Sequence, residues 1–378
     1  MGDIMIRKFS VENYRNFKEK ICLDFSNVRD YSFNTFCQKN GLISKIIMYG
    51  ENGVGKSNLG FALFDIVSVL TDRHITDEIG KKATLFLNAD SDEKEATFHY
   101  EFDINGHELQ YEYCKSDYNK LVSEKLMLDN SVVFSYDFEH KTFIEKDLDK
   151  IGANSLNFEF YENESSVLRY IANNGNIAEM QNVKELMQFV SRMLWFRSLD
   201  RNQYIGLNTK SRNFTEYIVE KNLLSDFNVF LNRVTGKNYK LISYADEVTG
   251  EQIILEEHRK RKINFFNAAS NGTRTLTLFY YWLSQFKEAS FVWMDEFDAF
   301  YHFELSEKVI REIIPFENVQ FVVTTHNTYL LSNSLLRPDA YLILRNGKVR
   351  NLPDSTFREL REGHNLEKLF RNGDFEDE

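Results

Sequence analysis

Eight residues near the N-terminus have the types and spacing to bind the phosphates of a nucleotide. Gly50 to Ser57 read GENGVGKS, which fits the P-loop pattern G-x-x-x-x-G-K-[ST]. Glycines let the backbone turn so that successive N–H groups face phosphate oxygens, and a helix that begins there adds positive potential. Lys56 would reach the β- and γ-phosphates, and the Ser57 hydroxyl would bind Mg²⁺. The phosphate-binding residues that we expect are Asn52, Gly53, Val54, Gly55, Lys56, Ser57 and Asn58.

The sequence around the P-loop favours phosphate binding over a glycine-rich turn without a ligand. Residues 46–49 (IIMY) are apolar and predict a short buried strand. Residues 58–70 carry apolar side chains at helical spacing, namely Leu59, Leu63, Ile66, Val67 and Leu70. A strand, a glycine loop and a helix in this order are the setting that the motif requires.

Two acidic residues follow another apolar segment, far along the chain. Residues 291–294 (FVWM) predict a strand that is buried on both faces, as in a parallel sheet. Asp295 and Glu296 come directly after it, which is the arrangement of a Walker B motif. We expect Asp295 to hold Mg²⁺, partly through water, and Glu296 to orient or deprotonate an attacking water.

Two further segments could complete such a site. The apolar run at 319–323 predicts a central strand, and His326 near its end would contact the γ-phosphate. The alternative is that His326 only caps the strand. Residues 276–286 are apolar almost all round and predict a buried helix, which begins after Ser270, Asn271, Gly272 and Thr273.

The order of these motifs resembles an ATP-binding-cassette (ABC) ATPase head. More narrowly, it resembles the soluble branch with RecF, the heads of structural-maintenance-of-chromosomes (SMC) proteins and the overcoming-lysogenization-defect (OLD) ATPases. Within that branch the chain is most similar to the short AAA-family ATPases of bacterial anti-phage and abortive-infection operons. Three segments carry the resemblance: FSVENYRNF at 9–17, ASNGT at 269–273 and DEFDAFYH at 295–302. It covers about residues 1–70 and 260–345.

The resemblance implies an α/β fold, an ABC-type P-loop ATPase head with a mixed β-sheet, an antiparallel β meander near the N-terminus and an inserted helical lobe. It implies ATP and Mg²⁺ as cofactors and a homodimer or higher even oligomer. Ser270, Asn271, Gly272 and Thr273 would then form a signature motif that acts on the ATP of the other subunit. Asn271 departs from the small residue usual there, and His302 would be the D-loop residue. The Q-loop glutamine has no clear place, with Gln110 and Gln203 as candidates.

The remaining sequence predicts the organisation of the chain. We expect an N-terminal ATPase lobe over 1–145, an inserted, mainly helical lobe over 146–260 and a C-terminal ATPase lobe over 261–378. Alternating apolar residues predict two strands in 4–25, around a turn at 13–17, and a meander over 95–145. The later expectations are an irregular stretch at 146–176, helices at 178–196 and 214–234, strands near 238–243 and 252–256 with a turn at 249–250, two strands at 340–345 and 348–351, and a frayed tail of 25 residues.

Composition limits the function classes. The formal net charge of −11 argues against a general, charge-driven coat on nucleic acid, although Arg259 to Lys262 (RKRK) could form a local basic groove. The alternative is a solvated turn balanced by Glu256 and Glu257. Three cysteines without metal spacing suggest a reducing cytosol, and no apolar run is long enough to span a membrane.

Three functions are compatible with these motifs. The first is an ATP-driven switch that controls a separately encoded effector, a nuclease or toxin, in anti-phage defence, with DNA or a phage-derived molecule as trigger. It is favoured because the stretch after His326 is too short for a nuclease module with clustered acids. The alternatives are a RecF-like DNA repair or recombination ATPase, which the acidic balance disfavours, and a transporter ATPase, which the aromatic β-rich meander fits poorly.

Overall fold

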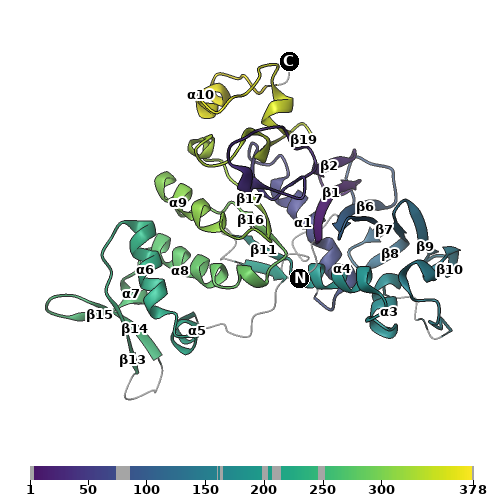
Figure 1. The fold of residues 1–378 in the computed structure, drawn as a ribbon, viewed down its shortest axis with the longest axis horizontal. Helices are drawn as coiled ribbons and strands as arrows, with labels where there is room; N and C mark the ends of the chain where they lie inside the picture. Colours follow the sequence, from purple (N-terminus) through teal and green to yellow (C-terminus); the bar gives the residue numbers. More distant parts are fainter. Residues whose placement is uncertain are drawn as a thin grey trace.

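The structure is a computed structural model that describes residues 4–73, 86–159, 161, 165–197, 203–206, 214–245 and 252–376. Two seven-stranded sheets lie at its centre, and a separate helical lobe extends to one side (Figure 1). The turn expected at 249–250 lies outside the described residues. Within the described part, no helix combines the length and the apolar character needed to cross a membrane.

The first sheet is the predicted antiparallel meander, with β1 added next to β6. Its strand order is β10-β9-β8-β7-β6-β1-β2. The strands are β1 (Ile4–Glu12), β2 (Ile21–Asp24), β6 (Ala96–Ile104), β7 (His107–Asp117), β8 (Lys120–Leu128), β9 (Ser131–Asp137) and β10 (Thr142–Lys146). Asn105 and Gly106, both with positive φ, form the turn between β6 and β7, as the sequence predicted.

The second sheet is mixed and has the order β12-β11-β16-β17-β5-β18-β19. Its strands are β5 (Lys45–Tyr49), β11 (Leu194–Arg197), β12 (Gln203–Gly206), β16 (Phe291–Asp295), β17 (Gln320–Thr324), β18 (Tyr341–Arg345) and β19 (Lys348–Asn351). The five inner strands run parallel, whereas β12 and β19 are antiparallel edges. Every residue of β5, β16 and β17 is buried, which explains why these strands read as continuous apolar runs.

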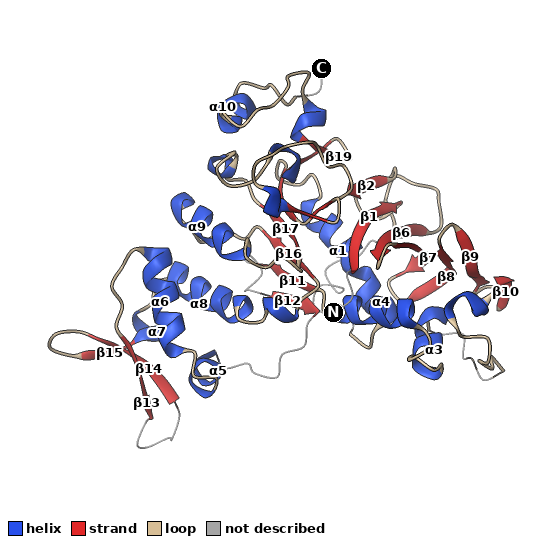
Figure 2. Ribbon diagram, in the orientation of Figure 1, coloured by secondary structure: helices blue, strands red, loops and turns tan. Residues whose placement is uncertain are grey.

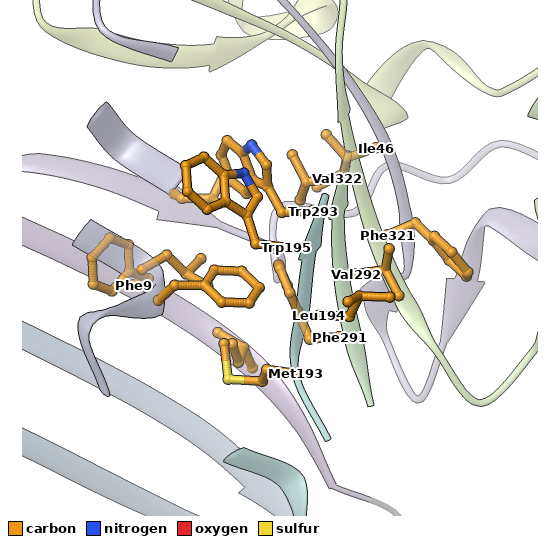
Figure 3. Close-up of a cluster of buried hydrophobic side chains, with 14 of the residues drawn as sticks. Phe9, Ile46, Met193, Leu194, Trp195, Phe291, Val292, Trp293, Phe321 and Val322 are labelled. Carbon is orange, nitrogen blue, oxygen red and sulfur yellow. The ribbon is translucent and has the colours of Figure 1, made fainter. Parts of the chain in front are cut away.

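Helix α1 (Lys56–Leu70) lies between the two sheets and contacts both. Its residue Gly60 lies so close to β16 that a Cβ there would meet the indole of Trp293 at 2.8 Å. On its other side, the hydroxyl of Tyr100 in β6 donates to the carbonyl of Ala62 at 3.0 Å. The amide of Gln320 also bridges the sheets, because it bonds both backbone polar groups of Ile6. Figure 3 shows part of this shared apolar core, with side chains from both sheets.

The helical lobe is inserted between β12 and β16 and carries a small sheet of its own, of order β13-β14-β15 (Figure 2). Its elements are α5 (Phe214–Glu220), α6 (Leu224–Thr235), β13 (Leu241–Ala245), β14 (Gln252–Glu257), β15 (Lys262–Asn264), α7 (Phe265–Ala268) and α8 (Asn271–Leu283). The prediction of a single helix over 214–234 is wrong in one respect. The segment forms two helices, α5 and α6, because the chain turns at Asn222, which has a φ of 54°.

Three other expectations are corrected. The helix predicted over 178–196 ends earlier, as α4 (Gln181–Ser191), because Leu194–Arg197 forms β11 beside the Walker B strand. The stretch at 146–176 is not wholly irregular, since it contains α3 (Val167–Asn174). The tail is not frayed up to residue 376: it forms α10 (Leu366–Arg371), and Leu366 and Phe375 are buried.

The remaining described elements are helix α9 and several short segments. They are η1 (Thr35–Cys37), β3 (Gln38–Lys39), β4 (Leu42–Ile43), η2 (Leu148–Ile151), η3 (Phe286–Glu288), α9 (Phe303–Ile313), η4 (Thr328–Leu330), η5 (Pro338–Ala340) and η6 (Leu352–Ser355). Helices α8 and α9 lie on the opposite side of the central strands from α1 (Figure 1). The three-part domain division stays a prediction, and β11 and β12 of its middle part lie in the central sheet.

Candidate nucleotide-binding site

The candidate site lies at the carboxyl end of three neighbouring parallel strands. Strands β16, β17 and β5 are adjacent, and they lead into the acidic pair, His326 and the P-loop respectively. Because parallel strands end at the same edge of a sheet, motifs that are more than 200 positions apart in sequence meet there. The structure therefore brings together the P-loop, Asp295, Glu296 and His326.

The P-loop has the backbone shape that its glycines predict. Gly53 and Gly55 have φ values of 80° and 108°, in the region that favours glycine. A Cβ on Gly55 would lie 2.3 Å from the side-chain amide of Asn16, in the turn that follows β1. Asn16 in turn donates to the carbonyl of Val54 at 3.0 Å and accepts from the amide of Asn58 at 2.7 Å. The loop is thus held from outside by the N-terminal turn.

Lys56 lies inside this loop and is almost fully buried. Its ammonium donates to the carbonyls of Gly50 and Glu51 at 2.8 and 3.1 Å, and it lies 3.0 Å from Nε2 of His326. Burial lowers the pKa of Lys56 from its ordinary value, and the carboxylates of Glu296 and Asp295 offset part of that effect. A buried ammonium with its donors pointing into a glycine loop fits a phosphate ligand.

The pKa of His326 is also lowered, first by burial and second by the charge of Lys56. A neutral imidazole can accept a hydrogen bond from the ammonium of Lys56 at Nε2, provided that its own proton is on Nδ1. The carboxylate of Glu296 lies 4.0 Å away on the Nε2 side. The lowered pKa favours the neutral form of His326, which lies between the P-loop lysine and the acidic pair.

The hydroxyl of Ser57 and the carboxylate of Asp295 form the oxygen pair expected of a Mg²⁺ site. Ser57 Oγ donates to Asp295 Oδ2 at 2.7 Å, and Asp295 itself is fully buried. The other oxygen, Oδ1, accepts from Thr324 Oγ1 at 2.8 Å. One hydroxyl and one carboxylate suit Mg²⁺, which usually takes few protein ligands and completes its shell with phosphate and water. The pair therefore fits the metal, which would supply charge neutralisation at the phosphates.

Glu296 adopts an unusual backbone conformation, with a φ of 45°. Side chains other than glycine rarely adopt this left-handed region, and doing so costs about 1–3 kcal/mol. The backbone N–H of Glu296 donates to Thr324 Oγ1 at 2.8 Å, so the same threonine holds both acidic residues. This turn points the carboxylate of Glu296 back toward His326.

Three residues of the site were not predicted. Arg197, at the end of β11, has its Nε 3.4 Å from Asp295 Oδ2. Arg15 in the N-terminal turn donates to Asn58 at 2.9 Å, and its guanidinium lies over the ring of Phe61. Thr324 connects Asp295 and Glu296. The sequence signal for Arg15 was present in the N-terminal turn, whereas Arg197, the last residue of the four-residue strand β11, gave none.

The predicted signature residues lie away from their own P-loop. Ser270 caps α8, since its hydroxyl accepts from the N–H of Thr273 at 3.2 Å, and Asn271 and Gly272 form the first turn. A Cβ on Gly272 would lie 3.1 Å from the carbonyl of Phe300, so this helix start contacts the loop after Walker B. Helix α8 is on the far side of the central strands from α1 (Figure 1). The structure thus does not bring these residues to Lys56 within one chain.

The D-loop candidate precedes α9, and the two Q-loop candidates lie in β7 and β12. His302 precedes α9 without capping it, and its ring lies 4.1 Å from that of Phe303. Gln110 lies in β7 and donates to Glu108 at 2.6 Å, within the meander. Gln203 pairs with Arg197 through the backbone of β12 and β11, while its side chain is outside the description. Both glutamine assignments stay predictions.

A cavity of about 390 Å³ adjoins the P-loop on the β18 side. Glu51, Val54 and His326 line it from the nucleotide site, and Arg345 and Phe370 line it from the C-terminal part. The ring of Phe370 packs 6.0 Å from that of Tyr49, the last residue of β5. The C-terminal helix is therefore part of the wall beside the site.

Comparison with known families gives one match that covers most of the motifs. The family model described as "AAA domain, putative AbiEii toxin, Type IV TA system" matches residues 46–332, which is more than half of the chain. The matched range includes the P-loop, Ser270, the acidic pair and His326. It confirms the resemblance to ATPases of abortive-infection systems. A search of the curated proteins found no match.

Solved structures that resemble the chain include three SMC heads. One is an SmcHead bound to the C-winged helix domain of ScpA, with 19% identity and a TM-score of 0.45, covering 92% of this chain and 97% of that one. The SMC head domain from Thermotoga maritima has 14% identity and a TM-score of 0.45, with the same coverage. An Smc head with an extended coiled coil, bound to the C-terminal domain of ScpA derived from Pyrococcus furiosus, has 15% identity and a TM-score of 0.46, covering 92% and 96%.

Proposed function

This chain belongs to the AAA-domain family of the putative AbiEii toxin of type IV toxin–antitoxin systems, and we propose that it is an ATP-hydrolysing switch of a bacterial anti-phage system. In this proposal ATP binding brings two copies together, and the dimer controls a separately encoded effector, a nuclease or toxin, in the cytoplasm. The family description, which refers to a toxin–antitoxin system, supports the defence context. DNA or a phage-derived molecule would be the trigger.

The observation that carries the proposal is the contact between Lys56 and His326, with Glu296 beside them. A phosphoryl-transfer site needs positive charge on the γ-phosphate and a group that orients the attacking water. Lys56 supplies the charge, and the carboxylate of Glu296 is the base. His326 lies beside both Lys56 and Glu296, and as a neutral hydrogen-bonding group it positions their side chains. Ser57 and Asp295 would hold Mg²⁺, which lowers the charge on the phosphates.

Two features support a dimer with shared sites. Ser270 and Gly272 stand at the start of a helix whose side chains are mostly buried, so the N–H groups of that start are fixed in place. Three large aromatic side chains are exposed next to the Walker B and His326 loops, namely Phe300, Phe303 and Tyr329. Exposed aromatics of this kind are typical of a protein interface. We propose that a second copy covers them and brings its signature residues to the ATP.

Phage plating tests the proposal in cells. The chain is expressed with its neighbouring genes, and the efficiency of plating is compared with that of Lys56→Ala and Glu296→Gln. Protection should depend on both residues and on one neighbouring gene. Protection by the chain without any neighbour would contradict the separate effector. Equal protection by the Lys56→Ala variant would contradict the ATP switch.

A further inference from the structure

The connection between β14 and β15 forms a hairpin tip that stands out from the helical lobe. The seven residues 257–263 (EHRKRKI), which we call the basic tip, are all exposed. The N–H of His258 donates to the carbonyl of Arg261 at 2.9 Å, which closes the turn. This connection reaches the edge of the molecule in Figure 2, on the side away from the meander.

The basic tip carries more cations than its own acids neutralise. Lys262 lies 3.9 Å from Glu257, and Glu256 faces His258 at 3.5 Å. Within the described residues, Arg259, Lys260 and Arg261 have no ion pair. The exposed Lys240 lies at the base, where its carbonyl accepts from the N–H of Glu257. A chain of net charge −11 thus concentrates positive charge at one protruding point.

The shape of the basic tip selects among anionic partners. A protein interface needs about 800 Å² on each side, much more than a four-residue turn offers. The major groove of B-form DNA is about 12 Å wide and admits a two-stranded β-ribbon, with phosphates on both rims. The tip has no Phe, Tyr or Trp on which unpaired bases could stack, and its one aromatic ring, His258, faces Glu256, so a single strand fits less well. The major groove of duplex RNA is too deep and narrow for side chains to read.

We propose that the basic tip binds the backbone of duplex DNA, without sequence preference. Arg259, Lys260 and Arg261 would contact phosphates on the two rims of a groove. This inference does not rest on the ATPase proposal, because the tip is remote from the P-loop in the fold. In a dimer, two tips could contact one duplex, which would raise the affinity through linked binding.

Fluorescence anisotropy with a labelled 30-base-pair DNA duplex, without nucleotide, tests this proposal. The test variant is Arg259→Glu/Lys260→Glu/Arg261→Glu in the full chain. The matched control, Lys94→Glu/Lys120→Glu/Lys141→Glu, makes the same charge change at exposed positions in or beside the antiparallel meander. We expect the test variant to bind about tenfold more weakly or worse, and the control to bind like the wild type. The slope of log affinity against log salt should become less steep by about 2.7.

The remaining outcomes each overturn the proposal. Absence of duplex binding by the wild type at low salt would do so, as would unchanged binding by the test variant. Equal losses in both variants would mean that net charge alone matters. If poly-glutamate displaced the DNA at an equal concentration of charges, the tip would instead be assigned to an acidic protein partner. Thermal melting and ATP hydrolysis of each variant, both expected to match the wild type, show that the fold is intact.

Discussion

The ammonium of Lys56 and the imidazole of His326 lie 3.0 Å apart, from Nζ to Nε2, although 270 positions separate the two residues. The contact exists because β5 and β17 are adjacent parallel strands that end at the same edge. It places Lys56, for which we propose phosphate binding, against the loop that follows Thr324 at the end of β17. The chemistry of the site can therefore be tested through either partner.

Replacing Lys56 by Ala should weaken nucleotide binding strongly. The phosphate charge would then be uncompensated, and a hydrogen bond to a charged group contributes about 1.5–3 kcal/mol. We expect ATP affinity to fall by a factor of about 10 to 150, measured by isothermal titration calorimetry. Lys94→Ala, at an exposed position, is the control. Unchanged affinity in the Lys56 variant would refute the P-loop assignment.

The pKa of His326 should lie below the ordinary histidine value of 6.5 and rise when Lys56 is replaced by Met. Burial still lowers it in the variant, but the repulsion from the ammonium is gone. Because the folded pKa is below the unfolded one, protonation opposes folding. The free energy of unfolding should fall as the pH drops below about 6.5. A ¹⁵N NMR titration, with His326→Gln to assign the signal, measures the pKa. A pKa unchanged by Lys56→Met would contradict the coupling.

Replacing Glu296 by Gln should leave ATP binding intact and stop hydrolysis. The amide keeps the size of the side chain but cannot act as a base, a role worth a factor of about 10²–10⁴. The ATP-bound dimer should therefore persist, which light scattering after chromatography would show. Asp298→Asn is a matched control, because Asp298 is on the same loop but bonds Thr325 instead. Wild-type hydrolysis by the Glu296 variant would place the base elsewhere.

Glu296→Gly should stabilise the fold while it removes activity. A φ of 45° strains the backbone of a glutamate but not that of a glycine. We expect the relief of this strain to exceed the free-energy cost of ordering the more flexible glycine on folding. We expect the free energy of unfolding to rise by about 0.5–1 kcal/mol, as measured by urea denaturation. Glu296→Ala keeps a Cβ and should show no such gain. A glycine variant less stable than the alanine variant would contradict the strain.

The contacts of Lys56, Ser57 and Asp295 were predictable because their motifs combine residue type, spacing and flanking strands. Arg197 was not, since a four-residue apolar strand cannot be told from the end of a helix by periodicity alone. The C-terminal helix was missed for another reason. The polar sequence hides two anchors, Leu366 in the helix and Phe375 after it, whose burial depends on partners elsewhere in the chain.

Mixing two inactive variants tests whether ATP sites are shared between subunits. Gly272→Glu would place a carboxylate where the γ-phosphate of the other subunit is expected, and like-charge repulsion in a partly dry site opposes binding strongly. Lys56→Ala damages the P-loop. In a heterodimer of the two, both lesions fall in one composite site, and the other site combines an intact P-loop with an intact signature. Hydrolysis should therefore partly recover on mixing.

The control for that experiment is Gly272→Ala, because any added Cβ at this position would lie 3.1 Å from the carbonyl of Phe300. An alanine variant that stays active shows that the charge, and not this contact, is responsible for the effect of glutamate. Heterodimers are verified by two affinity tags, and their ATPase rate is compared with the mean of the parents. If heterodimers form but no activity returns, there are two explanations. Either each chain hydrolyses ATP alone, or the two sites of a dimer hydrolyse ATP only when both are intact. A covalently linked pair with one damaged site separates these cases: half the wild-type rate favours independent sites, and no activity favours strict coupling.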